Sequence, residues 1–443
     1  MGRFAAGSSW TVVNAAASVV RMKWLALHLE TAGIGILSQT LSAQAWMGSV
    51  SGLGLGLPVT RLVAAAVGMR DDGAARRAVW TALAFIAAAV MSVVIAINLF
   101  AEPLAGLLLG SRAYASLLRI SSLGVLGFGL FPLVQGLCAG RADVRSPVAF
   151  ALAGAGTATL LTIAFVPLYG LTGAIWAAAV LYPVGVAAML WWHLRKRPEA
   201  VWPRPAPLVD RATARMLLSM AGATFVLPLL DQGTLLALRA HVLHAHGAAA
   251  NGLLQAALAV SQQAGAFFYA YLGSYALGTI TAAGAAHGPA AIESYTRKQW
   301  MPLIGAAALV FALVMVGATP LLRFLYSSRF DAAGPMMAYT IVGEFGRTCL
   351  QVVALGSLPL GGASLWFRIG VVQPVALAAA YAVFEATGSG PLSLPRAYAA
   401  AGILTFFAGA WMMARAGSAL RLRDLAVAAA GYAALLALVA ARG

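Results

Sequence analysis

The stretch Val79–Ala101, VWTALAFIAAAVMSVVIAINLFA, decides the fold class of this chain. A helix needs about 20 mostly apolar residues to cross a bilayer, because lipid offers no partner to unpaired backbone groups. This run meets that length without a single charged side chain. It therefore predicts a transmembrane helix.

Similar apolar runs recur from one end of the chain to the other, separated by short connectors rich in arginine. The other eleven runs of sufficient length are Phe4–Leu27, Ile34–Val67, Tyr114–Cys138, Val148–Val166, Thr172–His193, Met216–Arg239, Gly252–Thr281, Met301–Leu322, Pro335–Gly356, Ile369–Glu385 and Ala397–Met413. A thirteenth run, Leu425–Ala440, is shorter. The pattern predicts an all-α polytopic membrane protein with twelve transmembrane helices, or thirteen if the last run spans.

Composition agrees with this fold class. The chain is 61% hydrophobic and 9% charged, with a mean hydropathy of +0.86, whereas soluble domains are about 25% charged. The net charge of +16 lies in connectors, mostly on one alternating side, and Lys and Arg stay on the cytoplasmic side of membranes. We therefore expect a multi-pass protein of the bacterial inner membrane with a cytoplasmic N-terminus. The basic charge reports topology and does not point to a nucleic-acid partner.

The connector His193–Arg215 divides the chain. It is basic and rich in proline, it follows six apolar runs, and six more come after it. This placement is typical of transporters built by internal duplication. We predict an N-terminal six-helix lobe at 1–193, a cytoplasmic linker at 194–215, a C-terminal six-helix lobe at 216–415, and a basic connector with a possible extra helix at 416–443.

Nothing in the sequence indicates an enzyme. The two cysteines, Cys138 and Cys349, form neither a disulfide framework nor a metal site, and the histidines at 241, 244 and 246 are expected in a solvated turn. No Walker-type phosphate-binding motif is present. The predicted outer connectors are too short to hold a glycosyltransferase or polymerase domain. No catalytic residues, metal ligands or cofactors are expected.

The order of elements resembles the MOP superfamily of oligosaccharide flippases, the Wzx-like polysaccharide exporters related to MurJ and to the MATE drug exporters. The opening segment to Trp10, the turn TAGIG at 31–35 and the end of the second run, LPVTR at 57–61, are similar to that family's start. So are the basic connector RDDGAARR at 70–77 and, in the second half, Asp231 followed by GLLQAAL at 252–258. The resemblance implies two six-helix lobes around a central cavity that opens alternately to either side. It also implies a cargo of polyprenyl-diphosphate-linked oligosaccharide.

Four cations within the runs are candidates for binding such a cargo. Ionisable groups inside a bilayer are costly and tend to face a cavity, and guanidinium groups bind phosphate oxygens bidentately. The candidates are Arg21, Lys23, Arg239 and Arg347. In the alternative interpretation, Arg21 and Lys23 extend to the membrane surface along their apolar stems.

Two carboxylates lie within the runs: Asp231, at a depth comparable to that of Arg21 and Lys23, and Glu344. Asp231 is interpreted as a site for H⁺ or Na⁺ coupling, as a partner of the cations on the first helix, or as part of a structural ion pair. Glu344 either pairs with Arg347 one helical turn away or leaves that arginine to an anionic ligand. The candidate polar residues of the cavity wall are Asn14, Gln39, Gln255 and Gln262, whose amides suit sugar hydroxyls but also join helices.

The excess of arginine over acid favours a flippase that translocates a lipid-linked oligosaccharide across the inner membrane for surface polysaccharide biosynthesis. A cavity for cationic drugs would lean acidic, so an ion-coupled MATE-like exporter is the alternative, followed by a membrane glycosyltransferase or polymerase. The expected partners are the lipid-linked oligosaccharide and membrane lipids. A functional association with glycosyltransferases or a polysaccharide polymerase is also expected.

Overall fold

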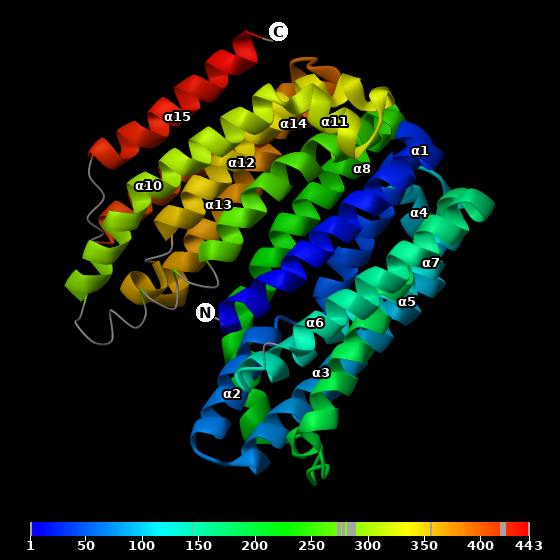
Figure 1. The fold of residues 1–443 in the computed structure, drawn as a ribbon, viewed down its shortest axis with the longest axis vertical. Helices are drawn as coiled ribbons and strands as arrows, with labels where there is room; N and C mark the ends of the chain where they lie inside the picture. Colours follow the sequence, from blue (N-terminus) through cyan, green and yellow to red (C-terminus); the bar gives the residue numbers. More distant parts are fainter. Residues whose placement is uncertain are drawn as a thin grey trace. The chain divides into compact units, whose positions relative to one another are not determined.

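The computed structural model describes residues 2–143, 145–272, 276, 280, 289–354, 357–416 and 422–441. The structure is 92% helix and these residues contain no strand, so the all-α fold class is confirmed. Figure 1 shows the chain as a set of long helices joined by short turns. Among the described residues, five helices are long and apolar enough to cross a membrane, and up to eight are if each bent pair is taken as one span.

Three of the longest helices each contain two spans. They are α1 (Gly2–Gly52), α7 (Gly156–Lys196) and α8 (Arg211–Tyr271), and each has one residue with non-helical backbone angles: Glu30, Gly170 and Gly247 respectively. At about 1.5 Å per residue, even the shortest of the three would exceed a bilayer core of about 30 Å twofold if it were straight. In the α7 region, the backbones at Gly154 and Gly185 lie against each other, so the chain folds back near Gly170. If each of the three helices is counted as two at its non-helical residue, the number of helices agrees with the predicted twelve or thirteen spans.

The other helices are shorter and follow the predicted runs. They are α2 (Gly56–Gly68), α3 (Asp72–Leu99), α4 (Ala101–Leu109), α5 (Ala115–Gly140), α6 (Ser146–Phe150), α10 (Pro289–Val316), α11 (Ala318–Leu325), α12 (Gly334–Ala354), α13 (Ser357–Ala386), α14 (Ser393–Arg415) and α15 (Leu422–Ala440). Short 3-10 turns lie at Arg112–Tyr114, Pro198–Ala200, Ser328–Ala333 and Gly390–Leu392, and a π turn lies at Ala151–Ala155. The last predicted run is thus helical as α15.

The chain forms two compact units, Met1–His244 and Ala245–Gly443. The division falls at the turn near Gly247 and not in the 194–215 segment, because the first arm of α8 packs against α1 in the first unit. The two six-helix lobes predicted from the sequence, 1–193 and 216–415, are a different division of the chain, and their boundaries stay a prediction. Each unit is described here by itself.

Glycines allow the helices of the first unit to approach closely. A side chain at Gly127 of α5 would overlap the backbone at Pro183 of α7, and one at Gly136 would overlap the carbonyl of Gly56. Small residues permit such approach between membrane helices, where packing and not hydrophobic exclusion drives association. The apolar core under these contacts includes Leu55, Val59 and Ile86, each fully buried.

The segment after α7 is fastened to the start of α3. The Trp80 indole donates to the Val201 carbonyl at 2.8 Å, and the Arg204 guanidinium lies over the rings of Trp80 and Trp202 at 4.8 and 4.9 Å. Such cation–π contacts suit exposed guanidinium groups beside large aromatic rings. The Asp210 backbone amide donates to Thr81 at 3.1 Å. The proline-rich linker is therefore an ordered strap along its described length.

In the second unit, α12 packs against α14 through glycine. The backbones of Gly343 and Gly402 lie in contact, and a side chain at Gly346 would overlap the Gly402 carbonyl. Helix α15 covers α10 and α12, where the Tyr432 ring meets Phe345 at a centroid distance of 5.0 Å. The extra helix is thus integrated into this unit.

Candidate functional site

A cavity of about 330 Å³ lies inside the first unit. Its wall is built from both arms of α1, from α5 and from the two arms of α7. The polar lining side chains are Ser18, Arg21, Gln44, Thr162 and Tyr182, and the rest of the wall is apolar. This division between a few polar groups and an apolar wall is typical of small-molecule sites.

Arg21 is the charged group of this wall. Its guanidinium donates to Ser18 at 3.2 Å, one turn earlier on α1, and the residues that line the cavity include no carboxylate. Gln44 is buried, and its side-chain oxygen has no hydrogen-bond partner within the described part of the chain. The cavity wall therefore carries one cation, with a buried amide beside it.

The other two candidates on this helix are placed differently. Lys23 is half-buried, and it does not line the cavity. Two residues along a helix turn by about 200°, so Arg21 and Lys23 point to opposite sides. The side chain of Asn14 lies outside the described residues.

Gln39 and Arg239 meet at a contact between the second arm of α1 and the first arm of α8. Gln39 is fully buried, and its amide nitrogen donates to the Leu236 carbonyl at 3.0 Å. The guanidinium of Arg239, 3% exposed, donates to Ser38 at 2.7 Å and to Ser42 at 3.0 Å. Neither Gln39 nor Arg239 lines the 330 Å³ cavity, and their proposed binding roles stay predictions.

Asp231 lies on the same arm of α8, where it is half-buried. Its neighbour Gln232 accepts a hydrogen bond from Ser49 at 3.2 Å, and the Trp46 indole donates to the Leu229 carbonyl at 3.1 Å. Asp231 therefore lies beside a row of hydrogen bonds that joins α1 to the first arm of α8 over several turns. Its role in coupling stays a prediction.

The second unit holds a buried carboxylate, Glu344 of α12. Glu344 is 1% exposed and accepts hydrogen bonds from the hydroxyls of Tyr269 and Tyr398, both at 2.6 Å. Arg347 donates to the Tyr398 hydroxyl at 3.2 Å, with its guanidinium 5.8 Å from that ring centre. Gln262 also bonds Tyr398, so two tyrosines bond the carboxylate directly, while Arg347 and Gln262 bond one of those tyrosines.

This network brings three predicted residues together, Glu344, Arg347 and Gln262. Gln255 is half-buried two turns before Gln262 on α8. Sequence reasoning missed Tyr398, as it missed Gln44, Thr162 and Tyr182 in the first unit. No helical spacing could have linked these residues to the site, because they come from other elements.

A second buried polar group, the Asp143 cluster, consists of Cys138, Asp143, Ser146 and His193. At the end of α5 the Asp143 amide donates to the Cys138 carbonyl at 2.9 Å, and Ala142 takes the left-handed conformation with φ 53. This is the six-to-one bond of a Schellman-type helix end. It turns the Asp143 side chain toward the start of α6 and the end of α7.

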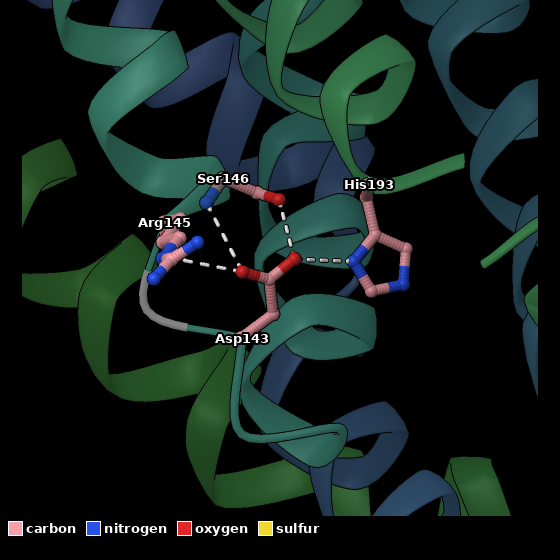
Figure 2. Close-up of polar contacts among 4 residues, drawn as sticks. All are labelled: Asp143, Arg145, Ser146 and His193. Atoms are coloured by element: carbon pink, nitrogen blue, oxygen red, sulfur yellow. Dashed lines mark hydrogen bonds and ion pairs between the residues drawn. The ribbon is translucent and has the colours of Figure 1, made fainter. Parts of the chain in front are cut away.

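Figure 2 shows the Asp143 carboxylate surrounded by donors. One oxygen accepts from the amides of Arg145 and Ser146 at 3.0 and 3.2 Å, and the other accepts from the Ser146 hydroxyl and from His193 Nδ1, the latter at 2.7 Å. Partial burial acts to raise the pKa of this carboxyl, but the hydrogen bonds from Ser146, His193 and the two amides outweigh it and lower the pKa to about 2. Asp143 is therefore an anion that joins three helix ends.

Comparison with solved structures identifies the arrangement of helices. The chain matches an inward-facing multidrug resistance MATE family transporter of the MOP superfamily with a TM-score of 0.73 and 15% identity, over 91% of this chain and 94% of that one. It matches the lipid II flippase MurJ, in an inward closed conformation, with a TM-score of 0.69 and 14% identity over 98% and 91%. The chain shares the overall fold of these two transporters.

A third match is a MOP superfamily transporter from Pyrococcus furiosus, whose description reports a reverse polarity of its binding pocket and suggests a different function. Its TM-score is 0.64, with 15% identity over 93% of this chain and 94% of that one. No protein-family model and no curated protein matches the chain. At these identities the MOP likeness establishes the fold.

Proposed function

We propose that this protein is a flippase that moves a polyprenyl-diphosphate-linked oligosaccharide across the bacterial inner membrane by alternating access, for surface polysaccharide biosynthesis. The observation that carries the proposal is the cavity of the first unit, whose wall bears the Arg21 guanidinium and no carboxylate. A desolvated guanidinium stays charged and matches phosphate oxygens geometrically. A lone cation in such a wall suits an anionic head group.

The remaining polar wall suits the sugar part of the cargo. Gln44, Thr162 and Tyr182 line the same cavity. Amides and hydroxyls bond sugar hydroxyls, while an aromatic ring packs on the apolar face of a sugar. Two fold neighbours are described as a lipid II flippase and as a transporter with reversed pocket polarity. Both descriptions support a flippase more than an exporter of cationic drugs.

The second candidate function is an ion-coupled exporter of cationic compounds. Glu344 favours it, because a buried carboxylate held by two tyrosine hydroxyls is a typical place to bind a cation or a proton. In the flippase the same residue serves coupling to H⁺ or Na⁺. The two functions therefore differ in cargo and share this carboxylate.

The test compares Arg21→Ala, Arg21→Lys and the control Arg61→Ala, an exposed arginine on α2. Lipid-linked oligosaccharide translocation is measured in proteoliposomes, and surface polysaccharide is measured in a strain that lacks the native gene, at equal membrane abundance. Charge-assisted hydrogen bonds contribute about 1.5–3 kcal/mol each, so Arg21→Ala should lower translocation by at least about tenfold. Arg21→Lys should recover part of it, because charge remains while the bidentate fork is lost.

Unchanged translocation in Arg21→Ala would contradict the proposal. Efflux of a cationic dye that fails in Glu344→Gln but is untouched by Arg21→Ala would instead establish the exporter. If Glu344 serves coupling in the flippase, Glu344→Gln lowers translocation without dye efflux in the wild type. In that variant the amide oxygen still accepts from one tyrosine hydroxyl, and the amide NH₂ group can donate to the hydroxyl oxygen of the other, so protein abundance should hold.

A further inference from the structure

We propose that Cys138, Asp143 and His193 form a binding site for a thiophilic divalent cation, with Zn²⁺ as the ion whose chemistry fits best. One ligand atom from each of the three side chains lies within 4.8 Å of the other two. Thiolate, imidazole and carboxylate are the three ligand types that Zn²⁺ takes in proteins. This site is separate from the cavity of Arg21, so the inference does not depend on the proposed cargo.

The positions of the ligands fit a site that closes on an ion. Zn²⁺ bonds of about 2.0–2.3 Å place tetrahedral ligands roughly 3.5 Å apart. To complete the site, the widest ligand spacing would shorten by about an ångström, and the 2.7 Å separation of His193 Nδ1 and Asp143 would widen. Water or the Ser146 hydroxyl, which already contacts Asp143, would take the fourth position, as water does in zinc sites with three protein ligands.

His193 contributes one of its two ring nitrogens, Nδ1, to the cluster. Its side chain is 0% exposed, its Nδ1 is engaged by Asp143, and its Nε2 has no hydrogen-bond partner within the described residues. Figure 2 shows Nε2 on the far side of the ring from Asp143, so Nδ1 is the nitrogen that would bind the ion. On metal binding, Nδ1 would exchange its hydrogen bond to Asp143 for a bond to the ion, and the Asp143 carboxylate would bind the same ion.

The site has a rigid frame and a way in. Cys138 is fully buried on α5, and His193 lies in the last turn of α7. Asp143 lies between α5 and α6, and Figure 2 shows its contacts with His193, Arg145 and Ser146. The Asp143 side chain is 19% exposed, which gives an ion access from the surface. A bound ion would tie the end of α5 to the end of α7, next to the strap that follows it.

The experiment measures Zn²⁺ and Co²⁺ binding to the full-length protein, purified in detergent and freed of metal with a chelator. Wild type should retain one Zn²⁺ more per chain than Cys138→Ser. Cys138→Ser and His193→Gln should each weaken binding at least about tenfold, the smallest loss seen even for outer-sphere partners of metals. Cys349→Ser, which removes the other buried cysteine, should bind as wild type does.

Co²⁺ reports the thiolate directly and needs no variant. The wild-type Co²⁺ complex should show sulfur-to-cobalt charge-transfer absorption in the near ultraviolet, and Cys349→Ser should keep it. Absence of that band in the wild type would overturn the proposal. So would Zn²⁺ binding of equal strength in wild type, Cys138→Ser and His193→Gln, because the ion would then be held elsewhere.

Discussion

The contact between Arg239 and two serines of α1 offers a sharp test of how buried charge is satisfied in this protein. Arg239 donates to Ser38 and Ser42, while each serine hydroxyl also donates to a carbonyl of its own helix, at 3.1 and 2.9 Å. The serines therefore keep a partner when the arginine is removed. The arginine loses two acceptors when the serines are removed.

This asymmetry sets the expected energies. Arg239→Met removes two charge-assisted hydrogen bonds but also removes the buried charge, so we expect a loss of about 2–3 kcal/mol. The double variant Ser38→Ala with Ser42→Ala removes both serine acceptors from the Arg239 guanidinium, which is 3% exposed. It should lower the free energy of unfolding by about 3–6 kcal/mol. The triple variant should recover much of that loss, with an interaction energy of at least about 2 kcal/mol.

Thermal unfolding in detergent, followed with a thiol-reactive dye, is a suitable assay. Cys138 and Cys349 are both free and buried, so the dye reacts when the chain unfolds. The double-serine variant should melt lower than Arg239→Met, and the triple variant should melt above the double. If the changes add within about 0.5 kcal/mol, the hydrogen bonds do not connect these residues and the reasoning is refuted.

Two further predictions concern packing and topology. Gly343→Ala should lower the free energy of unfolding by about 1–3 kcal/mol, because its new methyl group overlaps the Tyr398 carbonyl. The control Gly305→Ala places its methyl group in open space and should leave the melting temperature unchanged. Equal melting of both variants would show that α12 and α14 do not pack as described. Reporter fusions at Glu199 and Gly247 should report opposite sides of the membrane, and the same side for both would reject the predicted topology.

The sequence alone determined the fold class of the protein and the local geometry of its helices. Apolar runs of bilayer length leave a helix as the available backbone solution, so the all-α membrane fold followed from composition. Ser18 and Arg21 are three residues apart, a spacing that puts both on one face of a helix, and the two side chains are bonded at 3.2 Å. Such short-range geometry is set by the helical repeat, which sequence carries directly.

Only the tertiary structure decided which distant residues share a site. Tyr398 reaches Glu344 from another helix, and Gln39 is buried by the backbone of α8 and does not line the cavity of Arg21. Cys138 and His193 gave no metal signal in the sequence, since their spacing matches no ligand motif. These contacts depend on helix packing, which glycines and turns set across many positions at once, so no local pattern of residues could reveal them.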